Sequence, residues 1–210
     1  MVTATHPETV NYLDTILKDR GVQRHLDSLK KHHQESYEHS YRVGLLSIDL
    51  GFANGLRQLE IVLLGYSGLL HDLGKRFISY DVLNKEGPLT DEEKKVMDGH
   101  PRLGFLELKE TEHNDVTMIL IGHHEFKTNG YPRNGKDRRT IGHIPREQKD
   151  RRRTDHRLRN LAEIVAAADM YDALSSPRAY KPSLPKEKVE EILRKQYLGN
   201  PAYIEQVLAR

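Results

Sequence analysis

The sequence predicts an all-α protein, organised as one bundle of about seven or more helices. Apolar residues recur at the three- and four-residue spacing of a helix face in segment after segment. No segment of convincing length alternates apolar and polar residues as a half-buried strand does. Signals for helix ends fall at the borders of these segments. The length of 210 residues suffices for a domain of ordinary size with a real core.

The helical pattern begins near the amino terminus. Residues 8–30 show it in two stretches, and we expect Gly21 to separate two helices. Residues 34–51 repeat the pattern, with Gly51 as the expected C-terminal stop. Residues 57–70 are apolar on most sides, which predicts a buried helix.

The middle of the chain contains a connection and three further helices. Residues 81–88 are expected to form the connection. Thr90, followed by three acidic residues, has the composition of a helix N-terminus with a capping side chain. Residues 101–109 and 112–124 are the next two predicted helices.

The pattern then stops and resumes. Residues 127–159 show no sustained apolar periodicity, and Gly, Pro and charged residues dominate there. Residues 158–174 regain helical spacing. A turn is expected at 175–185, and an amphipathic helix at 186–198 completes the prediction.

Composition excludes several classes of protein. The chain has no cysteine, so a disulfide framework and a thiolate metal site are both excluded. Its net charge is only +2, which predicts no particular partner. No apolar run approaches the roughly 20 residues of a membrane span, and residues 1–11 lack the apolar core of a signal peptide. We therefore expect a cytoplasmic protein without membrane contact.

The most informative stretch is His71-Asp72-Leu-Gly-Lys75, at the end of an apolar run. Burying an adjacent imidazole and carboxylate is costly unless something compensates them. Metal coordination is one compensation, because both groups are good ligands for zinc, iron and manganese. Lys75 lies one turn later, where it could contact a substrate phosphate. Taken alone, a buried His-Asp pair at a helix end is as consistent with a structural role as with a metal site.

Other polar residues at predicted helix ends and faces favour the metal site. These residues are Glu35, His39, His100, His123, His124 and Asp169. Glu35 and His39 are four residues apart and project from one helix face. His123 and His124 are adjacent, so on a regular helix their side chains diverge by about 100°. Both can serve one site only if that site spans two metals or the helix ends there.

In this order the residues resemble the HD superfamily, and within it the HD-GYP group. His71-Asp72-Leu-Gly-Lys75 matches the HD-x-G-K signature, and His123-His124-Glu125 with Gly130-Tyr131-Pro132 resembles the HHE…GYP signature. The segment from Asp169 to Lys181 resembles the closing D-x-x-D-A-L-T-S-x-R-x-Y segment. The resemblance extends from about Glu35 to Lys181.

The resemblance implies a metal-dependent phosphodiesterase that hydrolyses cyclic di-GMP to the linear dinucleotide or GMP. It implies a buried site with two or three divalent metals, iron or manganese first, with zinc, nickel or magnesium as alternatives. The implied ligands are His39, His71, Asp72, His100, His123, His124 and Asp169, with Asp72 bridging and Glu35 at a third metal. Lys75, Arg178 and Lys181 would hold phosphates, and Tyr131 would border the substrate. Residues 31–210 would form this domain, and residues 1–30 a helical extension.

Two departures from the family pattern keep alternatives open. The loop His123–Pro132 is one residue shorter than the family's and lacks its aspartate, which favours another nucleotide or phosphoester as substrate. Residues 133–159 form a basic insertion with eleven Lys or Arg against four acidic residues. It is either a solvated loop or a segment that recruits a nucleotide or nucleic acid. A non-catalytic nucleotide sensor is the remaining alternative, and the oligomeric state stays open.

The other histidines are expected to be exposed. They are His6, His25, His32, His33 and His113.

Overall fold

The computed structural model describes residues 5–110, 114–128, 130–131, 155–177 and 183–210. Within these ranges the regular elements are helices and there is no strand, which confirms the all-α prediction. The α-helices are α1 (Thr9–Leu17), α2 (Arg20–His32), α3 (Gln34–Ala53), α4 (Gln58–Leu70), α5 (Tyr80–Leu83), α6 (Asp91–Met97), α7 (His100–Leu108), α8 (Asn114–Gly122), α9 (His156–Ser175), α10 (Lys186–Gln196) and α11 (Pro201–Leu208). Two short 3₁₀ helices, η1 (Leu73–Phe77) and η2 (His123–Phe126), follow α4 and α8.

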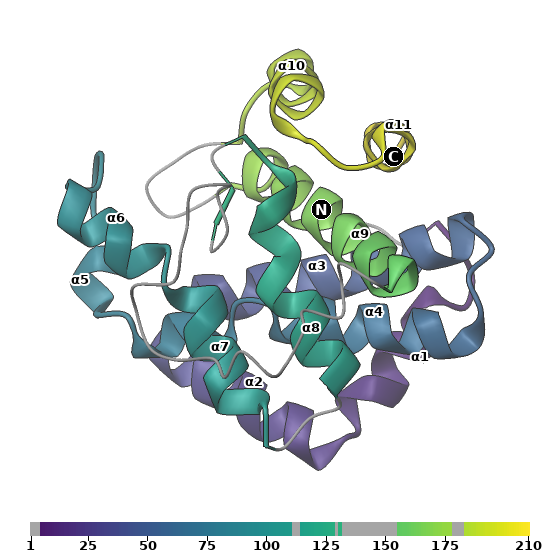
Figure 1. The fold of residues 1–210 in the computed structure, drawn as a ribbon, viewed down its shortest axis with the longest axis horizontal. Helices are drawn as coiled ribbons and strands as arrows, with labels where there is room; N and C mark the ends of the chain where they lie inside the picture. Colours follow the sequence, from purple (N-terminus) through teal and green to yellow (C-terminus); the bar gives the residue numbers. More distant parts are fainter. Residues whose placement is uncertain (1–4, 111–113, 129, 132–154, 178–182) are drawn as a thin grey trace.

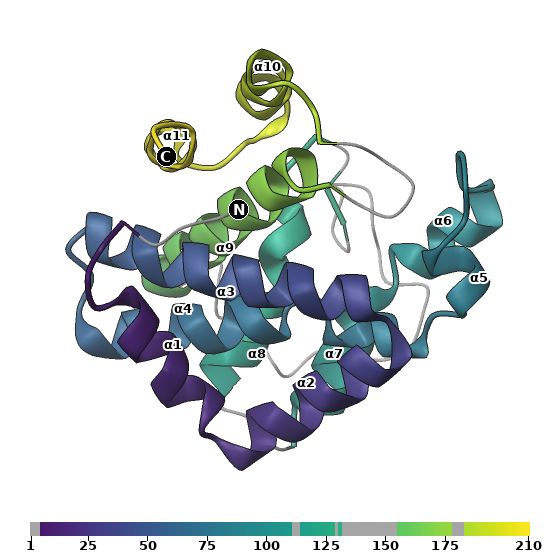
Figure 2. The ribbon, with the colours of Figure 1, turned by 180° about the vertical axis from the view of Figure 1, so that it is seen from behind.

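The long helices α3, α4 and α9 form the centre of the bundle, and α8 packs against α4 and α9 (Figure 1). Helices α1 and α2 cover one side of α3 and α4, whereas α10 and α11 lie against α9 (Figure 2). Buried side chains from α1 to α4 and from α7 to α11 form one hydrophobic cluster. Because α1 and α2 share this core, they pack as part of the bundle, while a domain boundary at residue 30 stays a prediction.

The first helix break is set by Asp19 and not by Gly21. Asp19 has extended backbone, and its carboxylate accepts hydrogen bonds from the N–H groups of Gly21 and Val22. This is an N-cap, which satisfies donors that the first turn of a helix leaves free. Gly21 therefore lies inside α2, and the prediction that it separates two helices was wrong.

Gly51 also does not end its helix. Helix α3 continues to Ala53, and the glycine with left-handed backbone is Gly55, at φ 62°. This matches the usual place of glycine just beyond a helix C-cap. Gly51 faces α4 instead, where an added Cβ would lie 2.9 Å from Cδ1 of Leu64. Close packing of α3 on α4 thus explains the glycine.

Apart from the short helices α5 and α11, the remaining helix borders agree with the sequence more closely. Thr90 caps α6, and its hydroxyl and the Glu93 carboxylate form the expected capping box. Helix α5 forms a single turn within the segment expected to be a connection. Helix α11 was missed, although Asn200 and Pro201 provide a cap and a first-position proline. No helix among the described residues is long and apolar enough to cross a bilayer.

Candidate metal centre

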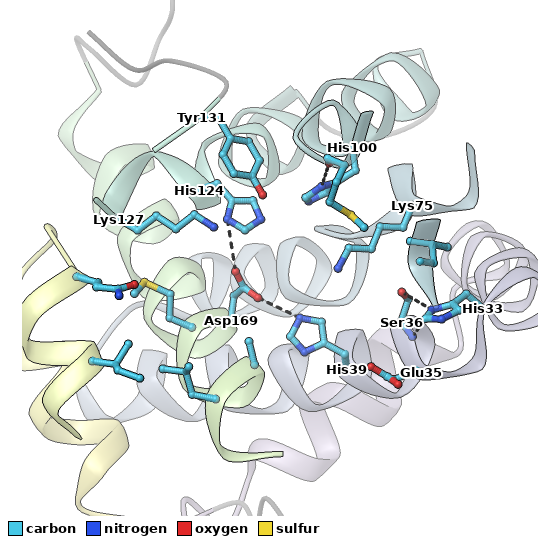
Figure 3. Close-up of a pocket in the computed structure, with 17 residues that line it drawn as sticks. His33, Glu35, Ser36, His39, Lys75, His100, His124, Lys127, Tyr131 and Asp169 are labelled. Atoms are coloured by element: carbon cyan, nitrogen blue, oxygen red, sulfur yellow. Dashed lines mark hydrogen bonds and ion pairs between the residues drawn. The ribbon is translucent and has the colours of Figure 1, made fainter. Parts of the chain in front are cut away.

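Seven buried polar residues from five parts of the chain meet inside the bundle, and Figure 3 labels His39, His100, His124 and Asp169 among them. These parts are α3, the end of α4, the start of α7, the helix η2 and α9. The residues are His39, His71, Asp72, His100, His123, His124 and Asp169, each at most 9% exposed. The family resemblance implied these seven as ligands, together with Glu35, and the fold brings the seven together.

The end of α8 explains how adjacent histidines face one site. Helix α8 ends at Gly122, and the chain tightens into η2 from His123 to Phe126. The rings of His123 and His124 have their centroids 4.2 Å apart, with 45° between their planes. The two rings therefore reach one site at the point where the regular α-helix ends, which is one of the two arrangements that the sequence left open.

Three imidazoles are oriented by the backbone carbonyl three residues before them in the chain. Nδ1 of His71 lies 2.8 Å from the carbonyl oxygen of Gly68, and Nδ1 of His100 lies 2.8 Å from that of Met97. His123 makes the same contact with the carbonyl of Leu120. A carbonyl can only accept, so in each ring Nδ1 donates the proton and Nε2 keeps its lone pair. Such backbone contacts are typical of metal-binding histidines.

Asp172 orients the fourth imidazole. Its Oδ2 lies 2.7 Å from Nδ1 of His39, and Arg42 donates to both of its oxygens at 2.7 and 3.0 Å. Ser176 adds a hydroxyl donor at 2.8 Å. Burial alone would raise the pKa of Asp172, but the hydrogen bonds from His39 and Arg42 outweigh it and lower the pKa to about 2. Sequence reasoning gave Asp172 no role, although it matches the second aspartate of the closing family segment.

The two remaining carboxylates lie between the imidazoles. Asp72 Oδ1 is 3.1 Å from Nε2 of His100, while Oδ2 is 3.5 Å from Nε2 of His71. Asp169 Oδ1 is 3.0 Å from Nε2 of His39, and Oδ2 is 3.9 Å from Nδ1 of His124. Asp72 thus stands between two groups of histidines, as a bridging ligand would.

Unsatisfied atoms show that this cluster suits a metal. Among the described residues, Asp72 Oδ1 and His124 Nδ1 are buried without a hydrogen-bond partner. Such groups are costly and rare unless a ligand compensates them. Nitrogen and oxygen donors lie within 4.8 Å of one another in three groups: His39, His71 and Asp169; His71, Asp72 and His123; and His100, His123 and His124. Donors of this kind fit divalent cations.

The protonation states agree with this interpretation. Burial lowers the pKa of His71, and lowers those of His123 and His124 well below the ordinary value, so these rings stay neutral. Burial opposes ionisation of Asp72, but Lys75 and the neighbouring imidazoles outweigh it and lower its pKa. Neutral imidazoles and ionised carboxylates are the forms that bind metals. His39 differs, because desolvation is outweighed by bonds to Asp169 and Asp172, which raise its pKa.

A cavity of about 330 Å³ opens onto the cluster, and three further predicted residues line it. Lys75 donates to Asp72 Oδ2 and lies at one side of the pocket (Figure 3). Tyr131 stacks on His124, with ring centroids 4.4 Å apart. Glu35 lines the pocket but belongs to none of the three close groups. Its role at a third metal stays a prediction.

Arg178, Lys181 and the basic insertion up to residue 154 lie outside the described residues. Their predicted contacts with phosphates or nucleic acid therefore stay predictions.

Two of the pocket residues that the sequence did not predict are ionisable, His33 and Lys127. His33 was predicted to be exposed, but it is buried, accepts from the Ser36 N–H and so caps α3. A helix start at residue 34 could have indicated this cap. Lys127 extends over the ring of Tyr131 and toward the cluster (Figure 3). No local sequence signal distinguishes Lys127 from a surface lysine.

Comparisons with known proteins agree with this geometry. A family model described as the HD domain matches residues 36–174. The chain is 35% identical to the cyclic di-GMP phosphodiesterase response regulator RpfG of Xanthomonas campestris, over 68% of this chain and 33% of that protein. It is 32% identical to a cyclic di-GMP phosphodiesterase of Thermotoga maritima, over 83% of this chain and 44% of that protein. The chain thus spans less than half the length of these relatives.

A solved structure shares the fold. The HD domain of the Listeria monocytogenes phosphodiesterase PgpH superposes with a TM-score of 0.55 at 18% identity, over 81% of this chain and 80% of that one.

Proposed function

This chain belongs to the HD domain family, and we propose that it is a metal-dependent phosphodiesterase that hydrolyses cyclic di-GMP. The observation that carries the proposal is the convergence of seven buried imidazoles and carboxylates, of which four line one pocket and two have unsatisfied atoms among the described residues. The relatives from Xanthomonas campestris and Thermotoga maritima are named cyclic di-GMP phosphodiesterases, which supports this choice of substrate.

The donor set supports two cations, bridged by Asp72. Asp72 contacts His71 through one oxygen and His100 through the other, so each oxygen faces a different histidine group. We propose iron or manganese, because imidazole and carboxylate without thiolate suit these metals. Bound cations would lower the pKa of water and neutralise charge on phosphoryl oxygens. Glu35, at the edge of the pocket, is the candidate ligand for a third ion.

The protein's own groups position the phosphodiester and stabilise its charge. Lys75 projects beside Asp72 into the pocket, where its ammonium group would donate to a non-bridging phosphoryl oxygen. This contact would strengthen as negative charge develops there. Asp172 keeps His39 in one orientation, and backbone carbonyl contacts do so for His71, His100 and His123. Hydrolysis then needs no nucleophile from the protein.

The decisive experiment measures turnover and metal content together. Protein loaded with Mn(II), or with Fe(II) under reducing conditions, is incubated with cyclic di-GMP, and the products are resolved by chromatography. We expect linear dinucleotide or GMP, and a loss of at least about 1,000-fold in Asp72→Ala, or roughly 4 kcal/mol of transition-state stabilisation. Asp81→Ala, the same substitution at an exposed acid of α5, is the control. Full metal content without any product would disprove the proposed substrate.

A second candidate substrate is another nucleotide phosphodiester. The shortened loop after His123 and His124 favours it, because this loop contributes Tyr131 to the pocket. The same assay with other cyclic dinucleotides separates the candidates, since the metal centre would serve each of them. A faster reaction with one of these would assign the substrate.

A further inference from the structure

The pocket has one wall that differs from the metal centre in chemistry and origin. Five residues of α9 and α10 form it, and we name it the α9–α10 wall: Met170, Ala173, Leu174, Ile192 and Gln196. Figure 3 shows the yellow C-terminal segment at the side of Lys127, whereas Lys75 and His33 lie at the opposite side. Four of the five side chains are apolar, and Gln196 provides the one amide.

Helix α10 is held against the pocket by specific contacts. Val189 and Leu193 are buried in the core and anchor the helix, which leaves Ile192 and Gln196 to line the cavity. The end of α10 pairs with the loop after η2. Lys127 and Tyr197 form an antiparallel bridge, and the Thr128 N–H donates to the Gln196 carbonyl at 2.9 Å. The wall and the histidine loop therefore form one connected structure.

Helix α10 lies beyond the part of the chain that the family model matches. That match ends at Leu174, so Ile192 and Gln196 lie outside it. A helix that lines the pocket beside the proposed metal centre is well placed to contact the part of a substrate that the metals would not bind.

Lys127 stands between the wall and the metal centre. Its side chain is half-buried, and its ammonium nitrogen lies 4.8 Å from the centroid of the Tyr131 ring. No carboxylate of the described residues lies within ion-pair distance of it. A half-buried cation that faces a pocket without an acidic partner favours an anionic ligand.

We propose that the α9–α10 wall is the nucleobase subsite of this pocket, and that Lys127 contacts a phosphate oxygen of the nucleotide bound there. This inference rests on the proposed function and specifies how the substrate is recognised. The flat base packs on Leu174 and Ile192, which supply the apolar surface typical of ligand pockets. The Gln196 amide can both donate and accept, so it can pair with the edge of a purine. No hydrogen bond of this amide to another described residue competes with that role.

Binding of two small ligands tests the base subsite without turnover. Calorimetry on the Mn(II)-loaded protein compares GMP with ribose 5-phosphate, which has the phosphate and the sugar but no base. We expect GMP to bind at least about 10-fold more tightly. Ile192→Ala and Gln196→Ala should each reduce this ratio by about 3-fold or more, while ribose 5-phosphate affinity is unchanged. Lys195→Ala, at an exposed position of the same helix, should leave the ratio unchanged.

Lys127→Met tests the phosphate contact separately. Methionine keeps the length of the side chain but removes the charge, so affinity for GMP and for ribose 5-phosphate should fall by the same factor, about 10-fold. Metal content should not change. Lys195→Met is the matched control on a solvent-exposed lysine. Unchanged affinity in Lys127→Met would overturn its assignment.

The outcomes separate this inference from the proposed function. Equal affinity for GMP and ribose 5-phosphate would overturn the base subsite even if cyclic di-GMP were hydrolysed. A preference for GMP that depends on Ile192 and Gln196, without hydrolysis of cyclic di-GMP, would support the subsite and overturn the proposed reaction.

Discussion

Asp49 and Asp72 are both only 1% exposed, yet their surroundings differ completely. Asp49, on α3, accepts from the backbone N–H and hydroxyl of Thr5 at 3.0 and 2.6 Å, and from the Thr9 hydroxyl at 2.7 Å. The His6 N–H and the Arg210 guanidinium complete its partners. Both carboxylate oxygens are therefore satisfied by the protein itself.

Asp72 has one cationic partner, Lys75, and otherwise faces imidazole nitrogens. Its Oδ1 has no hydrogen-bond partner among the described residues, although Nε2 of His100 is only 3.1 Å away. Because Nδ1 of the neutral His100 ring donates to the Met97 carbonyl, its Nε2 has a lone pair and no proton to donate to Asp72. Both aspartates are buried, so burial alone does not identify a functional residue. What distinguishes Asp72 is an incomplete set of partners that a ligand can complete.

The comparison predicts that Asp49→Ala damages stability much more than activity. The substitution leaves the nearly buried Arg210 without its acceptor, so the free energy of unfolding should fall by about 3–5 kcal/mol. Asp49 does not line the pocket, so kcat of the folded protein should be unchanged. Urea unfolding and a turnover assay measure the two effects. Asp14→Ala, at an exposed position of α1, is the control. A loss below about 1 kcal/mol would contradict the structural role of Asp49.

The effect of metal removal on stability should depend on Asp72 and not on Asp49. A cation that binds only the folded state stabilises it, by about 2.7 kcal/mol at a free concentration 100 times Kd. Thermal unfolding with Mn(II) and with a chelator should therefore differ in the wild-type protein and in Asp49→Ala. Asp72→Ala should show little or no difference, because its bridging ligand is missing. An equal metal-induced rise of Tm in Asp72→Ala would place the cation elsewhere.

A smaller effect is expected from Asp172, which touches the metal centre only through His39. Asp172→Asn keeps the shape but weakens the acceptor of the His39 Nδ1 proton. Metal affinity should fall about 10–100-fold, or about 1.4–2.7 kcal/mol. Competition with a chelator measures this directly. Ser176→Ala removes a single hydroxyl donor to the same carboxylate and is the matched control. A larger effect of Ser176→Ala would show that Asp172 acts by anchoring the end of α9.

Local patterns predicted the long helices and the proposed ligand residues. The Thr90 cap, the apolar run of α4 and the ordered histidine motifs are short-range features, and the fold agrees with each of them. The ligand residues stood out because imidazoles at the ends of apolar helices are unusual. The expectation that the seven residues meet at one site came from the resemblance to a known family, because sequence spacing alone does not fix contacts between distant helices.

Contacts between distant segments explain what was missed. Gly51 is a residue type that often ends a helix, but here it lies against α4. Only its close contact with Leu64 explains why a glycine is needed at this position. Asp172 meets His39 across 133 residues of sequence. Lys127 becomes a pocket residue because the end of α10 pairs with its loop. In each case the role depends on a neighbour that the local sequence does not contain.

The smallest expected effect is the change with pH in the stability that Asp49 contributes. Burial opposes ionisation of this carboxyl, but the hydrogen bonds from Thr5, His6 and Thr9 outweigh it and hold its pKa well below the ordinary 3.8. The unfolded chain therefore takes up the proton first as pH falls. The stabilisation by Asp49 should be complete above about pH 5 and should decrease below the unfolded pKa, by at most about 1.4 kcal/mol per pH unit.

Urea unfolding of chelator-treated wild-type protein and Asp49→Ala, at about pH 6 and at about pH 3, measures this change without the metal centre. We expect the stability difference between the two proteins to be smaller at the lower pH. A stability difference that stays constant or grows at the lower pH would mean that the folded protein stabilises the ionised Asp49 carboxylate no better than water does. The contrast with Asp72 would then lose its physical basis, because neither buried carboxylate would be fully satisfied by the protein.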